Sequence, residues 1–339
     1  MRVRGRETHE EVVVRALVLG ASGHIGNAIT RALIDRGYEV TAAGRRITLP
    51  INLAGLAIKY VQGDLDFPGQ IERWIEGHDV VIDAAAPYPS RLMPQGESAA
   101  AALEQVGRRT RMLIDAVRRQ QARLAYVSTF ATLGDCSTGF ERIQREWIRR
   151  LHPYFAVKER IEGEIRAAAR TGLTAVIVNP TLCIGPWDIK ARDLCFVPRL
   201  LGGEAPVSVA HSINVIDVRD VAAVLVTALE RERWGEPILL AGHNISVEAL
   251  YTWICEIGGV MPPRIVAPIT LGMIATYWSE LALGAIGLAP PLPALAPMLT
   301  MLHDSFEPSR IQSELGIVPR SLSGTLRDAI DWYRQIGYC

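Results

Sequence analysis

Short apolar runs rich in β-branched residues alternate with longer amphipathic segments over the first 180 residues. The expected strands cover residues 12–20, 38–45, 58–64, 79–86, 123–131 and 173–180, and helices are expected at 26–37, around 103–122 and across 151–162. Strands separated by helices are joined by right-handed crossovers into a parallel sheet that helices cover on both faces. The alternation therefore predicts an α/β fold with a doubly wound parallel sheet.

The pattern loosens after about residue 180 into loops, short helices and proline-rich turns. We therefore expect a loose tail at 1–12, a Rossmann domain with the catalytic residues at 13–180, and a smaller C-terminal substrate-binding lobe at 181–339. Segments around 205–245 are expected to return to the Rossmann domain. The boundary near residue 180 follows from this change of pattern and from the punctuation.

An apolar run at 269–289 approaches the length of a membrane span and contains a single charge, Glu280. Prolines bound it on both sides, which favours a buried helix, or one that covers a pocket, over a span. A helix lying on a membrane surface is the alternative. The first 15 residues hold no apolar run, so we expect neither a signal peptide nor an anchor there.

The charges of the chain are balanced, with 36 Lys and Arg against 36 Asp and Glu. No overall field favours nucleic acid as a partner. The five cysteines are odd in number, far apart and without metal-ligand spacing, which indicates free thiols in a reducing, cytoplasmic compartment. None of the seven histidines is paired with another ligand type at a suitable spacing, so no metal is expected.

Three glycines, Gly20, Gly23 and Gly26, follow the first expected strand in the stretch LGASGHIG and open the first helix. Glycine there permits a tight turn, close approach of backbone N–H groups to a pyrophosphate, and tight packing of helix on strand. The position between a strand and a helix is the context that makes such a motif informative. A dinucleotide site is therefore expected, with a structural turn as the alternative.

The end of the second strand bears on which dinucleotide binds. An acidic residue there would bind the ribose hydroxyls of NAD, whereas arginine accommodates the 2′-phosphate of NADP. This chain has Gly44 where the acid would stand, followed by Arg45 and Arg46. The pattern favours NADP(H) over NAD(H), and two solvated loop arginines are the alternative.

Tyr154 and Lys158 are four residues apart on an expected helix, a spacing that brings any two side chains together. The strand at 123–131 places Ser128 and Thr129 at the carboxyl edge of the sheet, where ligands of doubly wound folds bind. A phenol beside an ammonium can exchange a proton, because a nearby positive charge favours the phenolate. The alternative is an aromatic and a charge that only share a helix face.

With these motifs in place, the chain resembles an extended short-chain dehydrogenase/reductase of the epimerase/dehydratase superfamily. Its second half resembles dihydroflavonol-reductase-like proteins and the hopanoid-associated sugar-epimerase-like group. The resemblance covers nearly the whole chain and is carried by GASGHIG, Asp64 with Leu65, the run Ala84–Ala86, the hydroxyl of Thr129 or Ser128, Tyr154 with Lys158, NPTLCIGPWD (179–188), NVIDVRDVA (214–222), GEPILLAGHNIS (235–246) and LRDAIDWYRQIGY (326–338).

The resemblance implies roles for individual residues. Tyr154 would exchange the proton, Thr129 or Ser128 would orient the carbonyl, and Lys158 would tune Tyr154 and hold the nicotinamide ribose. The expected cofactor-binding residues are Gly20, Ser22, Gly23, His24, Ile25, Gly26, Arg45, Arg46, Asp64, Leu65, Ala84, Ala85, Ala86, Lys158, Asn179, Pro180 and Ile184. Tyr88 and Arg91 follow the fourth strand and are candidates for substrate contact, with a surface-loop role as the alternative.

The second lobe has few charges between residues 265 and 302, so a pocket built from it would be mainly apolar. A nucleotide-sugar diphosphate would need several cationic donors there, and Arg192, Arg199 and Arg310 are the only obvious ones. We therefore expect an NADPH-dependent reductase of a ketone or aldehyde on a small, fairly apolar molecule. A nucleotide-sugar epimerase or dehydratase and a non-catalytic NADP sensor are the alternatives.

The basic helix with Arg108, Arg109, Arg111, Arg118 and Arg119 is expected to be a solvated face, and a homodimer is the default assembly.

Overall fold

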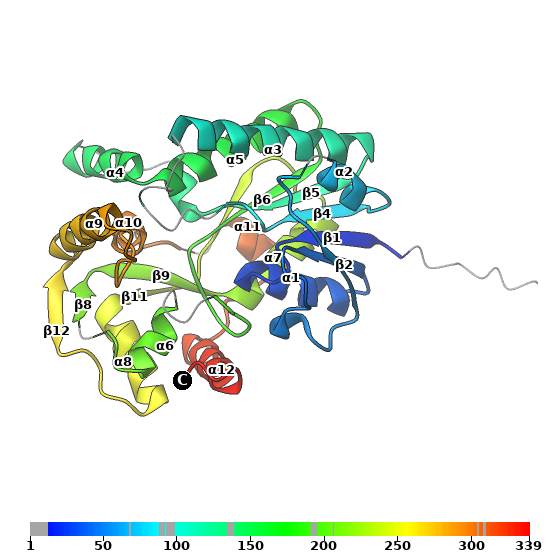
Figure 1. Cartoon of the computed structure of the whole chain (residues 1–339). Helices are drawn as coiled ribbons and strands as arrows, with labels where there is room; N and C mark the ends of the chain where they lie inside the picture. Colours follow the sequence, from blue (N-terminus) through cyan, green and yellow to red (C-terminus); the bar gives the residue numbers. More distant parts are fainter. Residues whose placement is uncertain are drawn as a thin grey trace, which may run out of the picture.

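The computed structural model describes residues 13–67, 69–87, 92, 99–133, 139–190, 195–205, 207–303, 305–307 and 310–339. Its centre is a seven-stranded parallel sheet in the order β10-β6-β5-β4-β1-β2-β3 (Figure 1). The six strands expected from the sequence are all in it, which confirms the doubly wound α/β fold. The strands are β1 (Arg15–Leu19), β2 (Glu39–Gly44), β3 (Ile58–Gln62), β4 (Val80–Asp83), β5 (Arg123–Val127), β6 (Ala175–Pro180) and β10 (Pro237–Leu240).

Helices cover both faces of this sheet, as Figure 1 shows. One face carries α1 (His24–Asp35) and α7 (Val218–Glu230), and the other carries α2 (Gln70–Ile75), α3 (Ala99–Arg119) and α5 (Pro153–Arg170). Strand β1 is buried on both sides because successive side chains alternate between the faces. Ala16 and Val18 pack with α1 and α7, whereas Leu17 and Leu19 pack with α3 and α5. Each buried leucine contributes on the order of 2 kcal/mol of apolar transfer free energy.

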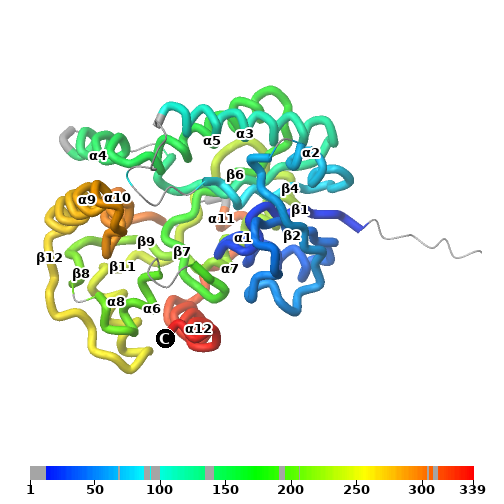
Figure 2. Tube along the Cα trace, in the orientation of Figure 1, coloured from blue at the N-terminus to red at the C-terminus, as the bar shows by residue number. Residues whose placement is uncertain are grey.

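A second group of elements lies beside the main sheet, at the left of Figures 1 and 2. A three-stranded sheet has the order β11-β9-β7, and β12 pairs with β8. Helix α7 and strand β10 come after residue 181 but lie on the main sheet, next to α1 and β6 respectively. The strands are β7 (Leu182–Ile184), β8 (Val207–Ala210), β9 (Ser212–Asp217), β11 (His243–Ser246) and β12 (Ile265–Pro268).

Short elements complete the chain. The 3-10 helices are η1 (Ile51–Leu53) and η2 (Phe130–Thr132), and the remaining helices are α4 (Gly139–Leu151), α6 (Phe196–Leu201), α8 (Val247–Gly258), α9 (Ile269–Ala285), α10 (Leu295–Leu302), α11 (Arg310–Glu314) and α12 (Leu322–Gln335). Helices α6, α8 and α12 share an apolar core with β7 and β9.

Helix α9 corresponds to the apolar run that was expected to be a buried helix or one that covers a pocket. Burial of the helix is wrong for most of its surface. Only Met273 and Glu280 of this helix are buried. Its inner side packs on a cluster that includes Phe130, Met298 and Tyr154, so it does cover one region of the interior. No helix in the described part of the chain is long and apolar enough to cross a membrane.

Candidate functional site

The glycine loop lies where the strand order reverses, between β1 and β4, which is the usual ligand crevice of a doubly wound sheet. Gly20 has φ +78°, and a Cβ on it would lie 2.7 Å from the carbonyl oxygen of Ala84. A Cβ on Gly26 would lie 2.2 Å from the carbonyl oxygen of Gly20. Both positions therefore require glycine, because β1, β4 and α1 approach one another too closely for any side chain.

Helix α1 begins directly after this loop, with Gly23 as its N-cap. Gly23 has no side chain to accept from the first-turn N–H groups, and residues 24–27 contain no acid. The positive end of the helix dipole therefore faces the crevice without a compensating group of its own. These features fit the pyrophosphate of a dinucleotide.

Asn52, which sequence reasoning missed, holds the loop from behind. Its buried Nδ2 donates to the carbonyl oxygens of Ser22 at 3.0 Å and Trp187 at 2.9 Å. The Asn27 amide donates to the Asn52 carbonyl oxygen at 2.8 Å. The loop is thus tied both to η1 and to the segment after β7. Contacts between residues 135 positions apart leave no local signal in the sequence.

His24 and Ile25 contribute their backbone to the start of α1, and their side chains turn to the protein interior. Ile25 packs against the core, and the His24 imidazole is buried near Asp188. Burial lowers the pKa of His24, although the negative charge of Asp188 opposes this effect. The imidazole is therefore neutral at pH 7.

The end of β2 is shaped by Tyr60. The Tyr60 hydroxyl donates to the carbonyl oxygen of Arg46 at 2.8 Å, and a Cβ on Gly44 would lie 2.9 Å from that hydroxyl. A side chain at the position of the acid in NAD-binding proteins would therefore displace the Tyr60 hydroxyl. Arg45 and Arg46 are exposed, and neither guanidinium forms an ion pair with a carboxylate of the described residues.

Asp64 and Leu65 follow β3. An oxygen of Asp64 accepts from the backbone N–H of Asp66 at 3.1 Å, so this carboxylate caps its own loop. Leu65 is partly buried against the core on the α3 side of the sheet. The loop-capping alternative for Asp64 thus has direct support, and one carboxylate can serve both purposes.

The run Ala84–Ala86 leaves β4 at the crevice, and its residues are half-buried. Asp83 is buried beneath it and accepts from the backbone N–H of Ala85 at 2.9 Å. Arg109 donates to the Ala85 carbonyl oxygen at 3.1 Å and lies 3.7 Å from Asp83. The sequence led us to expect Arg109 on a solvated face, and this is wrong. Its side chain is mostly buried because it lies next to the buried carboxylate of Asp83.

Lys158 is buried at the ends of β4 and β5. Its Nζ donates to the carbonyl oxygen of Val127 at 3.2 Å and lies 5.5 Å from the centre of the Tyr126 ring. Burial lowers the pKa of Lys158 to about 8, while Asp83 and Glu162 act in the opposite direction. A lysine whose pKa lies this close to neutral pH is typical of a functional site.

Tyr154 lies in the first turn of α5, not in the middle of a helix that begins at 151 as the sequence suggested. Pro153 starts the helix, and the Nδ1 of His152 caps it by accepting from the Tyr154 backbone N–H at 3.2 Å. The side chain is only 4% exposed, and its ring contacts Phe155 edge-on at 5.4 Å. A negative charge on Tyr154 would raise the pKa of Tyr126, whose ring also lies beneath the Lys158 ammonium. The helix thus brings the phenol and the ammonium to one end of the sheet.

Glu162, one turn beyond Lys158, is the centre of a buried hydrogen-bond network. Its Oε2 accepts from the hydroxyls of Ser128 at 2.6 Å and Thr132 at 2.5 Å, and from the Asn179 amide at 2.9 Å. Ser128 is therefore engaged inside the protein, whereas Thr129 accepts only a long bond from the Ala131 N–H at 3.4 Å. Within the described part of the chain, the Thr129 hydroxyl hydrogen has no acceptor.

The end of β6 was expected to line the nicotinamide. Asn179 and Pro180 are buried there, and the Asn179 amide donates at 3.0 Å to the Thr129 carbonyl oxygen. Ile184 is buried in the core that includes α6, α8 and α12. Burial raises the pKa of the Cys183 thiol to about 12, so this thiol is not a nucleophile at neutral pH.

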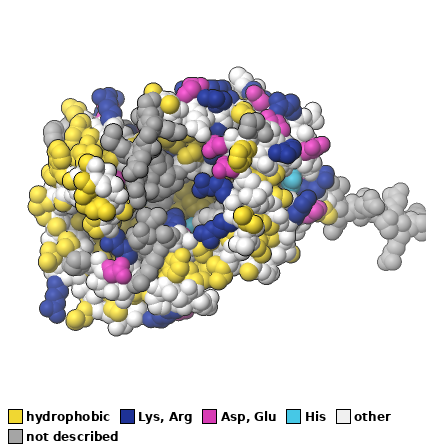
Figure 3. Space-filling view, viewed as in Figure 1, with side chains coloured by type: hydrophobic (Ala, Val, Ile, Leu, Met, Phe, Trp, Pro, Cys, Tyr) yellow, Lys and Arg dark blue, Asp and Glu magenta, His cyan; other side chains and the backbone are white. Residues whose placement is uncertain are grey.

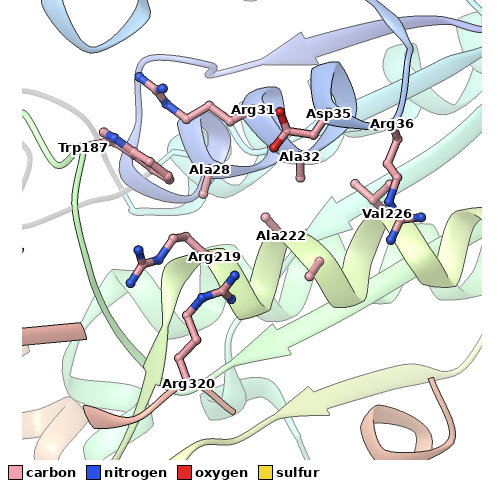
Figure 4. Close-up of a pocket in the computed structure, with 11 residues that line it drawn as sticks. Ala28, Arg31, Ala32, Asp35, Arg36, Trp187, Arg219, Ala222, Val226 and Arg320 are labelled. Carbon is pink, nitrogen blue, oxygen red and sulfur yellow. The ribbon is translucent and has the colours of Figure 1, made fainter. Parts of the chain in front are cut away.

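A groove of about 220 Å³ lies elsewhere, between α1 and α7 (Figure 4). Four arginines border it, but each already has a partner. Arg31 lies over the Trp187 ring at 4.4 Å, Arg219 pairs with Asp217 at 2.6 Å, Arg320 pairs with Asp220, and Arg36 pairs with Glu230. The groove therefore offers no open cationic site.

Tyr88 and Arg91, the candidates for substrate contact, lie outside the described residues. Among the residues that are described, no group of three or more His, Cys, Asp or Glu could hold a metal ion.

Comparison with known proteins shows the family of this chain. The model of the NAD dependent epimerase/dehydratase family matches residues 16–241. A dihydroflavonol 4-reductase-like protein of Synechocystis is 30% identical over 329 residues, covering 95% of each chain. Sterol demethylase protein B of Methylococcus capsulatus is 30% identical over 346 residues, covering 95% of this chain and 98% of the other.

A solved structure shares the fold along nearly its whole length. It is described as a nucleoside-diphosphate-sugar epimerase from Pseudomonas aeruginosa, and it is 26% identical with a TM-score of 0.71, covering 96% of this chain and 99% of the other. The family match spans the glycine loop, Tyr154 with Lys158 and the end of β6. This protein therefore belongs to the NAD-dependent epimerase/dehydratase family and is an NAD(P)-dependent oxidoreductase of the extended short-chain dehydrogenase/reductase type.

Proposed function

We propose that this protein is an NADPH-dependent reductase of a ketone or aldehyde on a small, fairly apolar molecule. The observation that carries the proposal is the environment of Tyr154, which belongs to an apolar cluster instead of a charged one. Its neighbours in that cluster include Phe130, Phe155, Met273, Leu295 and Met298. A substrate that reaches the phenol would therefore meet hydrocarbon surface.

The residues at the crevice suit carbonyl reduction. The nicotinamide would supply a hydride to the carbonyl carbon, and the carbonyl oxygen would take a proton to give the alcohol. Tyr154 is the proton donor, and the Thr129 hydroxyl donates a hydrogen bond that orients the carbonyl. Lys158, whose Nζ donates to the Val127 carbonyl oxygen, keeps a positive charge near the phenol. It neither donates the proton nor orients the carbonyl.

The cofactor preference rests on the end of β2. An acid at Gly44 would have to displace the Tyr60 hydroxyl, and Arg45 and Arg46 are exposed and unpaired with described carboxylates. Two guanidinium groups suit a 2′-phosphate, with which arginine makes bidentate hydrogen bonds. We therefore infer NADP(H) as the preferred cofactor, with the remaining cofactor-binding residues as expected from the sequence.

The relatives support a reductase with an apolar substrate over a nucleotide-sugar enzyme. One of them is a dihydroflavonol 4-reductase-like protein and another has a name that refers to sterols. Of the cationic candidates for a sugar diphosphate, Arg199 lies on α6 beside Tyr251, away from the Tyr154 cluster. Arg192 lies outside the described residues, and so does the side chain of Arg310. The epimerase-like structure keeps a nucleotide sugar as the second candidate.

Assembly, location and domain organisation are also proposals. We infer a cytoplasmic location, because Cys183, Cys195, Cys255 and Cys339 are free thiols. A homodimer, the commonest symmetric assembly, is proposed as the default. We also propose a cofactor domain up to about residue 180 and a substrate lobe after it, with segments around 205–245 returning to the cofactor domain.

The test uses purified protein with NADPH or NADH and a panel of apolar ketones, aldehydes and nucleotide sugars. Net loss of reduced-nicotinamide absorbance with apolar ketones or aldehydes is the expected result. Turnover of a nucleotide sugar without net oxidation would identify an epimerase instead. Cofactor binding without turnover across the panel would identify a sensor, and either of these results would overturn the reductase proposal.

A further inference from the structure

The outer side of α9 is an exposed apolar stripe. Leu271, Ile274 and Trp278 are 59%, 48% and 64% exposed, and their spacing of three and four residues puts them on one side of the helix. Hydrophobic side chains gather at the left edge of the molecule in Figure 3, where α9 and β12 lie. Contiguous exposed apolar surface on a soluble fold marks an interaction site.

The stripe continues on both sides of the helix. Ile265 and Val266 of β12 precede it, and Ile286 and Leu288 follow it, all four being exposed. We call these four residues together with Leu271, Ile274 and Trp278 the α9 face. The segment 265–302 has one charged residue, Glu280. The α9 face therefore carries no charge of its own.

Glu280 is turned inward. Its Oε1 accepts from the Leu92 backbone N–H and its Oε2 from that of Ala294, both at 2.7 Å. The carboxylate thus fixes α9 against the segment before α10 and holds a defined side of the helix to the outside. Met273, on the inner side, packs in the same cluster as Tyr154.

Helix α4, next to α10, is basic and amphipathic. Arg145 donates to the carbonyl oxygen of Leu302 at 3.4 Å, which joins α4 to the end of α10. Ile143 and Trp147 are 65% and 54% exposed, four residues apart on α4. The helix has four arginines, at positions 142, 145, 149 and 150, against two glutamates, at 141 and 146. Arg145 and Arg149 are half-buried and donate to backbone carbonyl oxygens, so the exposed ones are Arg150 and Arg142, which pairs with Glu146 at 3.3 Å. Lys and Arg side chains appear beside the apolar region at the top left of Figure 3.

We propose that the α9 face and the exposed side of α4 dock on the surface of a bilayer that contains anionic lipid. An uncharged apolar side with tryptophan suits the boundary between headgroups and acyl chains, and neighbouring arginines suit anionic headgroups. A second copy of this chain would present the same uncharged α9 face and the same net-positive α4, which offer no anionic surface to the exposed arginines, so the charge favours anionic lipid as the occupant.

The docked face lies next to the site. Because the inner side of α9 borders the Tyr154 cluster, an apolar substrate dissolved in the bilayer would enter across this helix. That consequence rests on the proposed function, whereas docking itself is independent of it.

The experiment is flotation of the full chain with vesicles of phosphatidylcholine, alone or mixed with phosphatidylglycerol. Wild-type protein is expected to float with the mixed vesicles, more weakly with the neutral ones, and less at high salt because salt screens the arginines. The triple variant Leu271→Gln, Ile274→Gln, Trp278→Gln is expected to bind the mixed vesicles at least about 10-fold more weakly. The matched control is Ile47→Gln with Val318→Gln, which removes two exposed apolar side chains elsewhere.

NADPH binding and light scattering complete the design. Unchanged NADPH affinity shows that the triple variant is folded. If the triple variant does not fold, the single variant Trp278→Gln is used instead, with a smaller expected loss of vesicle binding. Wild-type protein that floats with neither vesicle, or a triple variant that floats as well as the control, overturns the proposal. The proposal is also overturned if light scattering shows that wild type is a dimer and the triple variant a monomer, because the α9 face would then bind a second copy of this chain. Turnover of a water-soluble ketone is expected to be equal in all variants, so failure of docking and failure of the reductase proposal are told apart.

Discussion

The Ser128 hydroxyl donates a 2.6 Å hydrogen bond to Oε2 of Glu162, and this bond joins the end of β5 to the helix that carries Tyr154 and Lys158. Glu162 is 3% exposed and also accepts from Thr132 and Asn179. A buried carboxylate with this many donors fixes the relative positions of strand and helix. It also sets the electrostatic environment of Lys158.

Replacing Glu162 by glutamine keeps the shape and removes the charge. Because Glu162 raises the pKa of Lys158, which burial brings to about 8, the variant lowers that pKa further. The ammonium is then lost at lower pH, and the alkaline limb of kcat/KM is expected to move to lower pH by about one unit. Glu164→Gln, on the half-buried side of the same helix, is the control. Identical pH profiles for wild type and Glu162→Gln would remove the proposed positioning role.

Tyr154→Phe tests the proton donor. The ring packs in the apolar cluster, so phenylalanine preserves the fold while removing the proton. We expect turnover with an apolar ketone to fall on the order of 100-fold or more, with NADPH affinity unchanged by fluorescence titration. Tyr277→Phe removes a hydroxyl from the same cluster and should keep normal turnover. Full activity of Tyr154→Phe would exclude the phenol as the proton donor.

The cofactor preference is tested by Arg45→Ala with Arg46→Ala. Loss of two guanidinium groups is expected to weaken NADPH binding by about 10-fold or more and to leave NADH binding nearly unchanged. Arg73→Ala, an exposed arginine on α2, is the control for general charge effects. The reverse experiment is Gly44→Asp with Tyr60→Phe, which removes the hydroxyl 2.9 Å from the new Cβ and should favour NADH. Equal losses for both cofactors would contradict a 2′-phosphate site.

Two glycine-to-alanine changes should have opposite effects on the free energy of unfolding. Gly26→Ala places a Cβ 2.2 Å from the Gly20 carbonyl oxygen and is expected to destabilise by about 2 kcal/mol or more. Gly163 is exposed within α5 with no heavy atom near its Cβ position. Alanine there should stabilise by about 0.5–1 kcal/mol. Denaturant unfolding of both variants measures the difference, and a tolerated Gly26→Ala would refute the close packing of the loop.

His152 makes stability depend on pH. Burial lowers its pKa from the ordinary value of 6.5 to about 4, so the unfolded chain binds this proton more tightly than the folded one. Its contribution is complete above about pH 6.5 and is lost as pH falls towards about 4. His152→Asn keeps a capping oxygen without titrating, so it should lose less stability between pH 7 and pH 4, by on the order of 2 kcal/mol. Thermal unfolding across this range, with His243→Asn as control, measures the effect. Parallel curves for His152→Asn and wild type would show that the imidazole is not the titrating group.

The sequence by itself determined the sheet, the glycine loop and the spacing of Tyr154 and Lys158. Each of these is a local pattern. A few neighbouring residues are enough to show the periodicity of a strand or helix, or a turn that only glycine can make. Gly20 illustrates this, since its positive φ and the strand before it are encoded within one short stretch.

The tertiary structure alone decided which polar side chains are buried together. Nothing local separates Arg109 from the other arginines of α3, or Glu162 from the other acids of α5, because Asp83 and Ser128 approach them only when distant strands and helices pack. Asn52 was missed for the same reason. Helix α9 is apolar on all sides in sequence, so its outer side became evident only when Glu280 and Met273 were found turned inward. Periodicity encodes that a segment is a helix, whereas the partners that desolvate one of its sides come from elsewhere in the chain.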